Sequence, residues 1–452
     1  MNSPGPGLIS SLLDTDLYKL LMARWVLRHH PEVEVEFALV NRTRRVRLAE
    51  QLDLDALRQE LERFRTLRFS AEEVAALASL RIGGQEVFPT PFLEQLQQLR
   101  LPPFELWVED GQLRLSFRGP WAAALLWEVP ALALITELRS RAVLRRLPDA
   151  ERQQLFGAAR TRLHAKLERL AALQGLRLVD FGTRRRFSGA WQEQALLAAR
   201  QRLGSALLGT SNLQWALRHG LPPIGTHAHE LPMVLGALAG SDGELAEAPY
   251  RVLQQWQELY GPPLDIVLPD AYGTETFLHR APAWVARWGG LRLDSGDPQA
   301  LGEAVIAWWL AHGEDPSAKT LIFSDGLDVE AIERLHHQFA GRVRLCFGWG
   351  TLLSNDYRGL HPDDALAPLS LVCKAISANG RPTVKLSDSG GKTLGPAAEV
   401  TRYQRVFAAG REAQSSCRTP NRPAPASAQG RPPGTDLQGR SEGAQGSTGV
   451  AW

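Results

Sequence analysis

Cysteine is scarce in this sequence, with three residues among 452. Cys346, Cys373 and Cys417 stand at no spacing that is typical of a metal site or a redox pair. The sequence therefore gives no sign of a disulfide framework or of a cysteine-based metal centre. Such a composition suits the reducing cytoplasm, where we expect the protein to be located.

A large net charge and a long hydrophobic run are also missing. The net charge is +2, so we expect neither nucleic acid nor a membrane surface as a partner. The most apolar stretch, from Trp121 to Ile135, contains Glu128 and Pro130, and we expect it to be too short to span a bilayer. Charged residues interrupt the apolar run near the N-terminus, so we expect no signal peptide.

The length of the chain and its 44% of hydrophobic residues allow two or three domains with a sizeable core. Residues 416–452 hold 11 Gly or Pro among 37 positions and few large apolar side chains, so we expect a disordered tail there. Before the tail we expect a flanking α+β domain over 1–125, an α/β barrel over 126–395, and a helix over 396–415 that packs back on the barrel.

Two patterns in the first region support the α+β expectation. Apolar residues from Leu48 to Phe64 recur at spacings of three to five, which predicts one amphipathic helix. The segment QLRLSFRG alternates between apolar and polar residues and ends in a Gly-Pro turn, which predicts a half-buried strand.

From residue 126 onward, helical stretches such as 149–174 and 298–312 alternate with short apolar strands that end in Asp, Gly, Ser or Thr. Repeated strand–turn–helix units are typical of a parallel α/β barrel or sheet. Functional groups gather at the carboxyl ends of the strands in that architecture, so polar residues at these ends predict an enzyme. The strands are expected within LRLVDFGT, LPPIGTHAHE, LDIVLPDAYGT, GLRLDSGDP, TLIFSDGLD, RVRLCFGWGT and PTVKLSDSGGKT.

Several of these strand ends are suited to phosphate. The segment DFGTRRR (180–186) places three guanidinium groups after a strand, and guanidinium groups bind phosphate or carboxylate oxygens. A solvated helix start is the open alternative, because 45 of the 51 basic residues are arginine. Two later strands run into Gly326 and into Gly348 and Gly350, and as an ordered pair these turns predict a phosphate site.

The segment LDSGDP supplies two carboxylates beside a glycine. Asp294 suits the vicinal hydroxyls of a ribose or a magnesium-bound diphosphate. Asp297 suits a helix cap, because Pro298 would then stand at the first helical position.

The segment GTHAHE carries His227 and His229 two positions apart. In an extended segment the two rings share a face, as in a metal site, although no third ligand lies at a recognisable spacing. Alternatively, one imidazole accepts a phosphoryl group and is oriented by a carboxylate such as Glu230 or Asp270. The spacing alone leaves both interpretations open.

Eleven short motifs occur in the order found in nicotinate phosphoribosyltransferases, and the resemblance runs from about Leu12 to Arg411. It implies transfer of a phosphoribosyl group from phosphoribosyl diphosphate, with Mg²⁺, to nicotinate, coupled to ATP hydrolysis through a phosphohistidine. It also implies an irregular (β/α) barrel and a homodimer with shared active sites. The motifs are SLLDTDLYKL, FRGPW, WEVP, DFGTRRRFS, LGTSN, GTHAHE, DAYGT, RLDSGDP, FSDGLD, FGWGT and KLSDSGGKT.

Carried onto this chain, the resemblance makes His229 the phosphorylated residue and Asp270 the group that orients it. Arg184 would hold phosphate, and Asp294 would hold the ribose hydroxyls. No metal ligand from the protein is expected. Further substrate contacts are expected at Thr183, Arg292, Ser324, Asp325 and Thr351, with the 5′-phosphate at Gly326, Gly348 and Gly350.

The resemblance also implies a site for the pyridine ring between Phe181 and Tyr18, with Tyr18 contributed by the partner subunit. The alternative for Tyr18 is packing within an amphipathic helix. Related nicotinamide enzymes place an aspartate where this chain has Ser211. A serine hydroxyl can donate to a carboxylate without repulsion, so Ser211 favours nicotinate.

Some positions depart from the family pattern. Gly390 stands where proline is usual, and Trp349 stands where a smaller aliphatic residue is expected. We expect these changes to alter affinity and not the class of reaction. Lys385 and Lys392 are two of only six lysines, and they are candidates for contacts with diphosphate or ATP.

Three alternatives stay open. The first is a nicotinamide or quinolinate phosphoribosyltransferase, of which Ser211 disfavours the nicotinamide enzyme. The second is a metal-dependent barrel lyase that uses His227 and His229 as ligands. The third is a catalytically inactive homologue that binds ligands and uses the tail for interactions.

Overall fold

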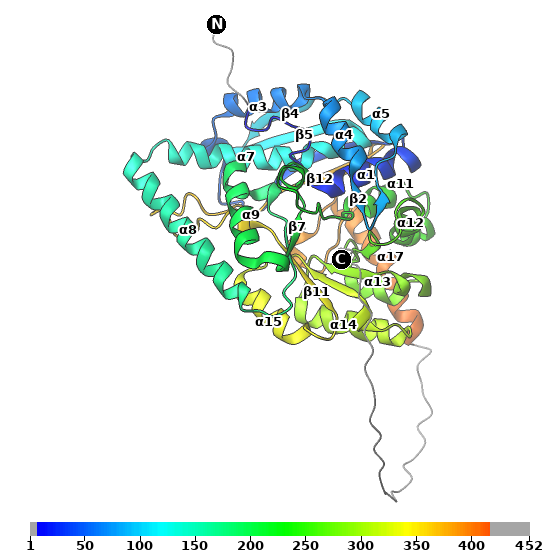
Figure 1. Ribbon diagram of the computed structural model, residues 1–452. Helices are drawn as coiled ribbons and strands as arrows, with labels where there is room; N and C mark the ends of the chain where they lie inside the picture. The colour runs from blue at the N-terminus through cyan, green and yellow to red at the C-terminus, as the bar shows by residue number, and fades with distance from the viewer. Residues whose placement is uncertain (1–6, 416–452) are drawn as a thin grey trace, which may run out of the picture.

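The computed structural model describes residues 7–415, which form two large sheets and the two-stranded sheet β2-β3, with helices around them (Figure 1). The first sheet is antiparallel and has five strands in the order β13-β12-β1-β5-β4. The second is parallel and has six strands in the order β7-β6-β11-β10-β9-β8. In Figure 1 the antiparallel sheet lies with α3, α4 and α5 at one end of the molecule, and the parallel sheet lies with α14 and α15 at the other.

The N-terminal region builds most of the antiparallel sheet. In β1 every second residue, including Val35, Phe37 and Leu39, is buried, and both edges of β1 are paired. The expected strand QLRLSFRG is confirmed as β5. The elements of this region are α1 (Leu17–His29), β1 (Glu34–Asn41), α2 (Leu48–Gln51), α3 (Leu54–Thr66), α4 (Ala71–Ser79), β2 (Arg81–Ile82), β3 (Gln85–Glu86), α5 (Thr90–Gln98), β4 (Phe104–Glu109) and β5 (Gln112–Pro120).

The single helix expected from Leu48 to Phe64 is wrong, because the structure has two helices there. Leu52 is extended, and the Asp53 side chain accepts a hydrogen bond from the backbone N–H of Ala56 at 3.0 Å. An aspartate in this position caps a new helix, so the chain ends α2 and begins α3.

The apolar stretch that begins at Trp121 is longer than expected. A 3-10 turn joins α6 (Trp121–Ala124) to α7 (Glu128–Leu144). Pro130 does not interrupt this run, because it lies in the first turn of α7, where its missing N–H costs no hydrogen bond. These 24 residues are long and apolar enough to cross a membrane, which corrects the expected length. Their most apolar window is 100% buried inside the fold, so the stretch packs as a core helix.

The parallel sheet curves around one core. Val179, Ile266, Ile322 and Cys346 come from four strands of the sheet and form one buried cluster with Ile224, which lies in the segment between β7 and β8. This packing confirms the expected α/β barrel. Its strands are β6 (Leu178–Asp180), β7 (Leu207–Thr210), β8 (Ile266–Val267), β9 (Gly290–Leu293), β10 (Thr320–Phe323) and β11 (Arg344–Trp349).

The barrel is irregular between β7 and β8. The strand expected in LPPIGTHAHE is wrong, since Pro222 and Pro223 lack the N–H groups that a ladder needs. This segment makes one parallel bridge, from Pro223 to Thr210, and the His227 ring then donates from Nε2 to the Ile266 carbonyl at 3.0 Å. The His227 side chain therefore connects this segment to β8, where the backbone hydrogen bonds of a strand would otherwise do so.

The last part of the expected barrel region contributes to the other sheet. Strand β12 (Leu371–Ala378) pairs with β1, and β13 (Arg381–Pro382) pairs with β12. The strand expected in PTVKLSDSGGKT is thereby corrected, because only its start is a strand and Lys385 makes an isolated bridge to Leu394. The division at residues 126 and 395 stays a prediction, but strand pairing joins sequence from both sides of it.

Helices cover the parallel sheet, and both helices expected there are confirmed as α8 and α14. Asp297 caps α14 as expected, because its side chain accepts from Gln299 N at 3.0 Å. The tail predicted for 416–452 lies outside the described residues. The helices are α8 (Asp149–Ala171), α9 (Gly189–Leu203), α10 (Leu213–His219), α11 (Glu230–Leu238), α12 (Asp242–Leu259), α13 (Thr274–Arg280), α14 (Pro298–Ala311), α15 (Val329–Phe339), α16 (Thr351–Ser354) and α17 (Ala397–Ser415).

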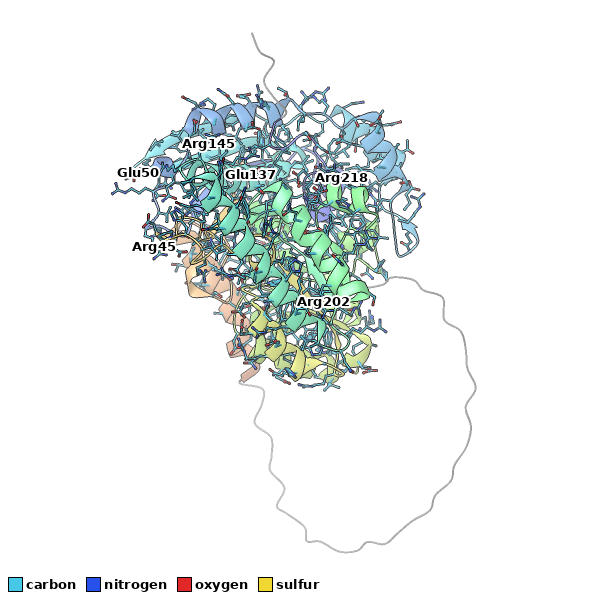
Figure 2. The ribbon with its side chains drawn as sticks, turned by 60° about the vertical axis from the view of Figure 1, so that its left-hand side comes forward. Arg45, Glu50, Glu137, Arg145, Arg202 and Arg218 are labelled. Carbon is cyan, nitrogen blue, oxygen red and sulfur yellow. The ribbon has the colours of Figure 1, made fainter. Side chains whose placement is uncertain are left out.

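Surface charge is spread over several elements. Figure 2 labels Arg45 after β1, Arg145 after α7, Arg202 on α9 and Arg218 on α10, and these side chains lie apart from one another. Arg202 also forms an ion pair with Glu168 of α8. The basic groups that bear on function are consequently those at the strand ends.

A buried ion pair ties the segment before α1 to the barrel. Both terminal nitrogens of Arg186 donate to the Asp14 carboxylate at 2.6 Å, and Asn212 donates to the same carboxylate at 2.8 Å. Both charged side chains are 5% exposed or less. The pair satisfies charges that could not be buried alone.

We expect Asp14→Ala to lower the free energy of unfolding by about 3–5 kcal/mol, because it leaves the Arg186 guanidinium buried without its partner. Urea denaturation followed by circular dichroism measures this change. Asp149→Ala removes the exposed pair with Arg152 and serves as the control, with an expected loss of about 0–1 kcal/mol. Equal losses in the two variants would contradict the expectation.

Candidate active site

The carboxyl ends of the parallel strands supply the polar groups of the site. Asp180 ends β6, Asp270 follows β8 and Asp294 follows β9, while Ser324 follows β10. Because parallel strands point the same way, these residues lie at one end of the barrel.

Asp270 is the carboxylate around which the site is built. It is fully buried and contacts the His229 Nε2 atom. Ser295 donates its hydroxyl to Asp270 at 2.6 Å, and the Lys385 ammonium lies 3.4 Å away. Burial alone would raise the pKa of Asp270, but His229 and Lys385 hold it well below its usual range. Asp270 therefore stays ionised.

His229 is held as a neutral imidazole. Burial, together with the nearby Lys385 charge, lowers its pKa to about 4 although Asp270 acts in the opposite direction. A carboxylate can only accept, so the Nε2 atom that faces Asp270 carries the proton. The Nδ1 atom keeps its lone pair and lies 3.9 Å from an Asp294 oxygen. This is the arrangement of an oriented nitrogen nucleophile.

The other two candidates in GTHAHE are engaged elsewhere. His227 bonds to the Ile266 carbonyl, and burial and then Arg292 lower its pKa to about 3. Glu230 accepts from Lys19 and Trp121 and so does not orient His229. No group of three or more metal-binding side chains occurs among residues 7–415, and the two histidine rings have separate partners. The geometry thus disfavours a histidine metal pair.

Asp294 lies within the site and is 28% exposed. Ser324 donates to one of its oxygens at 2.6 Å. Burial raises the pKa of Asp294, but Arg292 and His229 outweigh burial and lower it. Arg292 itself donates to the His227 carbonyl at 3.3 Å. An ionised, partly open carboxylate of this kind can accept hydrogen bonds from sugar hydroxyls.

The three arginines of DFGTRRR have different roles. Arg184 is 37% exposed and lies 3.2 Å from Glu128, whereas Arg186 is buried against Asp14. Arg185 donates to a backbone carbonyl, and burial and then its neighbours Arg184 and Arg42 lower its pKa to about 10. Arg185, whose neighbours include two other guanidinium groups and which has no carboxylate ion pair within residues 7–415, is thus suited to binding an anion.

Arg42 is a residue that sequence reasoning missed. It follows β1, and burial and then Arg184 lower its pKa, while Asp325 raises it. Arg42 is therefore close enough to Arg184 and Asp325 for their charges to affect its pKa. The signal in the sequence was the basic run NRTRR directly after an alternating strand.

The aromatic ring of Phe181 is placed by β11. The Phe181 N–H donates to the Trp349 carbonyl at 2.9 Å. A Cβ atom added at Gly348 would lie 2.3 Å from two atoms of the Phe181 ring. Gly348 therefore lies within a strand and makes room for the ring, which differs from the expected phosphate turn; its contact with phosphate stays a prediction.

The turns that follow β10 and β11 contain Gly326 and Gly350. Gly326 has φ +62°, a left-handed conformation that favours glycine, and a Cβ atom there would meet open space. Asp325 beside it forms an ion pair with Lys392. Gly350 directly precedes Thr351, which begins the short helix α16. Phosphate binding by these residues stays a prediction.

Ser211 has a hydrogen-bond partner that the sequence argument did not consider, and its contact with substrate stays a prediction. Its hydroxyl donates to Asp16 at 2.7 Å, and Asp16 was not among the expected site residues. Burial raises the pKa of Asp16, although Arg184 lowers it. The structure thus places a buried carboxyl group directly behind the serine. Thr183 is also buried in this region and accepts from Gln192.

Tyr18 lies in the first turn of α1, beside the end of β7. The preceding N–H, of Leu17, donates to the Ser211 carbonyl at 2.7 Å, and a Cβ atom added at Gly225 would lie 3.4 Å from the Tyr18 Cβ atom. Within one chain Tyr18 therefore stands near its own barrel. Its contribution to a partner subunit stays a prediction.

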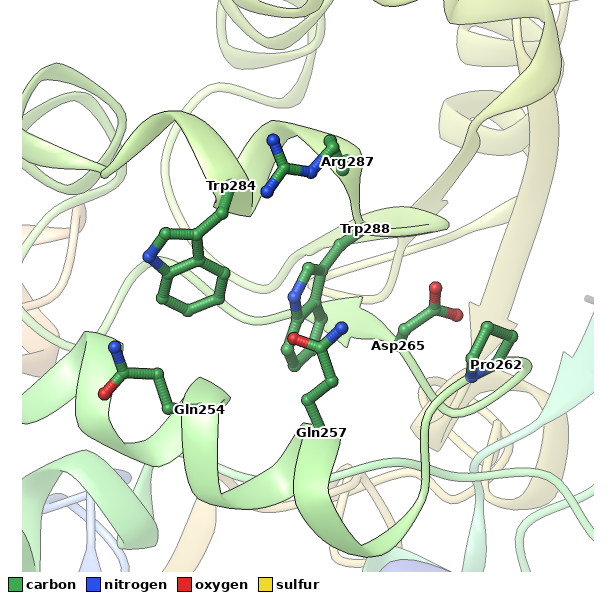
Figure 3. A pocket seen from close by; sticks show the side chains of 7 residues that line it. All are labelled: Gln254, Gln257, Pro262, Asp265, Trp284, Arg287 and Trp288. Carbon is green, nitrogen blue, oxygen red and sulfur yellow. The ribbon is translucent and has the colours of Figure 1, made fainter.

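A separate cavity lies at the opposite end of the barrel. It has a volume of about 350 Å³ and is shown in Figure 3. Asp265 precedes β8 and Trp288 precedes β9, whereas the site residues follow those strands. This cavity is consequently not part of the candidate active site. It is lined by Gln254, Gln257, Pro262, Asp265, Trp284, Arg287 and Trp288.

A parallel barrel whose strand ends gather arginines, ionised carboxylates and an oriented neutral histidine belongs to the class of enzymes that act on phosphorylated sugars. Residues 13–136 match the family model of the nicotinate phosphoribosyltransferase (NAPRTase) N-terminal domain, and residues 176–411 match that of the nicotinate phosphoribosyltransferase (NAPRTase) family. The chain belongs to the nicotinate phosphoribosyltransferase family, whose members are transferases of NAD biosynthesis.

Solved structures agree with this family. Nicotinate phosphoribosyltransferase from Vibrio cholerae is 33% identical, with a TM-score of 0.79 over 92% of this chain and 99% of that chain. The enzyme from Porphyromonas gingivalis is 29% identical, with a TM-score of 0.78 over 88% of this chain and 100% of that chain. The match confirms the fold that the resemblance implied.

We expect Lys385→Gln to raise the pKa of His229 from about 4 toward its ordinary value, because the Lys385 charge now lowers it. NMR titration of protein labelled at histidine measures the change. Arg342→Gln removes a distant surface charge paired with Glu303 and should leave this pKa unchanged. An unchanged or lower pKa in Lys385→Gln would show that the ammonium does not act on the ring.

Proposed function

We propose that the protein transfers the phosphoribosyl group of phosphoribosyl diphosphate to nicotinate and couples this transfer to ATP hydrolysis through phosphorylated His229. The observation that carries the proposal is the neutral His229, held at Nε2 by Asp270 and free at Nδ1, beside the arginine-rich strand ends. The family match supports the transfer reaction, and the histidine geometry supports the coupling.

In the transfer step, the pyridine nitrogen of nicotinate forms a bond to C1 of the ribose while the bond from C1 to the diphosphate oxygen breaks. As the C1–O bond breaks, its electron pair goes to the diphosphate oxygen, so cations must stabilise the negative charge that develops on the leaving group. Arg42, Arg184 and Arg185 are the described groups suited to that task. Phe181 would stack on the pyridine ring, and Asp294 would hold the ribose hydroxyls.

Magnesium would bind together with the diphosphate. Asp294 and Asp325 are the open carboxylates at the strand ends, and Mg²⁺ is usually held by one or two carboxylates plus substrate oxygens. Bound in this way, Mg²⁺ would neutralise charge on the leaving group.

In the coupling step, the Nδ1 lone pair of His229 attacks the terminal phosphorus of ATP, and ADP leaves. Asp270 keeps the Nε2 proton in place and stabilises the positive charge that forms on the ring. Water later hydrolyses the phosphohistidine and releases phosphate. Because the phosphoryl group adds negative charge, it changes the affinity of the site for charged substrate and product.

The choice between nicotinate and nicotinamide depends on Ser211 and Asp16 together. Since the Ser211 hydroxyl donates to Asp16, it must turn away from Asp16 before it can donate to nicotinate. Burial raises the pKa of Asp16, although Arg184 lowers it, so this carboxyl group is easier to protonate than an exposed one. We therefore propose nicotinate as substrate, in a cytoplasmic homodimer with shared active sites.

An assay with nicotinate, nicotinamide and quinolinate, each with and without ATP, tests the substrate. We expect nicotinate to be used fastest and ATP to stimulate its use. Faster turnover of nicotinamide would show that Asp16 and not Ser211 decides the choice, and ATP-independent use of quinolinate would overturn the proposed reaction.

We expect His229→Asn to abolish labelling of the protein by γ-³²P-ATP and to abolish nicotinate-dependent ATP hydrolysis, while slow uncoupled transfer remains. Labelling is measured on the intact protein, and nucleotide products are measured by chromatography. His219→Asn, which alters a histidine paired with Glu193 outside the site, is the control. Full nicotinate-dependent ATP hydrolysis in His229→Asn would sink the proposed coupling.

We expect Gly348→Ala to raise the KM for nicotinate by on the order of tenfold, because the new methyl group displaces the Phe181 ring. Steady-state kinetics with each substrate varied in turn measures this change, and the KM for ATP should move little. Gly157→Ala on α8 meets open space and is the control. A KM for nicotinate at the wild-type value would contradict the stacking role of Phe181.

A further inference from the structure

Lys19 occupies an unusual position for an ammonium group, because its side chain is completely buried. It lies 2.7 Å from a Glu128 oxygen and 2.8 Å from a Glu230 oxygen. A buried charge of this kind is strongly unfavourable unless its partners remain in place. Displacement of one carboxylate therefore changes the electrostatic environment of the ammonium and of the other carboxylate.

Glu230, one of the two partners of Lys19, is joined to His229. Glu230 is the next residue in the chain and begins α11. Both of its oxygens are occupied, one by Lys19 and the other by the Trp121 indole N–H at 2.6 Å. The backbone of His229 is thus anchored through Glu230 to the N-terminal region, independently of the ring contact with Asp270.

Glu128, the other partner of Lys19, contacts a group proposed to hold substrate. The second oxygen of Glu128 lies 3.2 Å from Arg184 and 3.6 Å from Lys374. Lys19 also follows Tyr18 directly, and its ammonium lies 5.3 Å from the centre of the Tyr18 ring. One buried network therefore contacts the proposed phosphate group and the proposed ring-stacking group.

We infer that Lys19, with Glu128 and Glu230, forms the link through which the phosphorylation state of His229 changes the affinity of Arg184 for substrate, and that of Tyr18 for substrate at the shared site that it lines in the dimer. The inference rests on the proposed function, in which His229 is phosphorylated. These are positioning residues, since they act through Tyr18, Arg184 and His229. A phosphoryl group on His229 changes the charge one residue from Glu230, and the chain of direct contacts gives that change a route to the substrate side.

The test compares the KM for nicotinate without and with ATP in the full-length protein. In the wild type we expect this ratio to exceed about fivefold, a usual size for coupling between two sites. In Trp121→Phe, which removes the hydrogen bond to Glu230 together with part of the buried ring, and in Lys19→Met, we expect the ratio to fall toward one. Labelling of His229 by γ-³²P-ATP should persist in both variants, which a general loss of structure would not allow.

Trp127→Phe is the matched control, because Trp127 is equally buried and its indole donates to the Pro102 carbonyl at 3.0 Å, outside the network. A wild-type ratio in Trp121→Phe would overturn the inference even if Lys19→Met fails to fold. An equal fall in Trp127→Phe would also overturn it. A wild type that is not labelled and shows no effect of ATP would overturn the proposed coupling itself, and the inference with it.

Discussion

The site depends on one requirement, which is that the buried charge of Asp270 must be satisfied. The carboxylate follows β8 and receives its partners from three other segments, namely His229, Ser295 and Lys385. A buried carboxylate without these partners would be strongly unfavourable, so the segments must come together as the barrel folds. The hydrogen bond to Asp270 fixes the proton on Nε2 and leaves Nδ1 facing Asp294, while burial and the Lys385 charge keep the imidazole neutral.

Direct contacts join the N-terminal region to the barrel around that site. The Asp14–Arg186 pair joins the segment before α1 to the loop after β6, and β12 returns from the barrel to pair with β1. Contacts of this kind explain why the fully buried Lys19 lies next to groups from both regions. Residues that are far apart in the sequence consequently share the electrostatics of one site.

Several features of the fold could be predicted because they depend on local patterns. The strand QLRLSFRG, the helices α8 and α14 and the cap at Asp297 follow from periodicity and from capping chemistry. The errors arose where a local signal was overlooked or outweighed. Asp53 divides an otherwise continuous helical pattern, and two prolines prevent a strand before His227.

Among the candidate residues, the sequence by itself determined which chemistry was available. The residue types led to Asp294 and to the two histidines of GTHAHE, while the order of motifs led to the family and, through it, to His229 and Asp270. Only the tertiary structure decided which carboxylate faces His229, since Asp270 and Glu230 were equal candidates by type. It also decided that Ser211 donates to Asp16 and that Gly348 makes room for Phe181. The physical reason is that hydrogen-bond partners and steric clearance depend on distances between segments remote in the chain, which no local pattern contains.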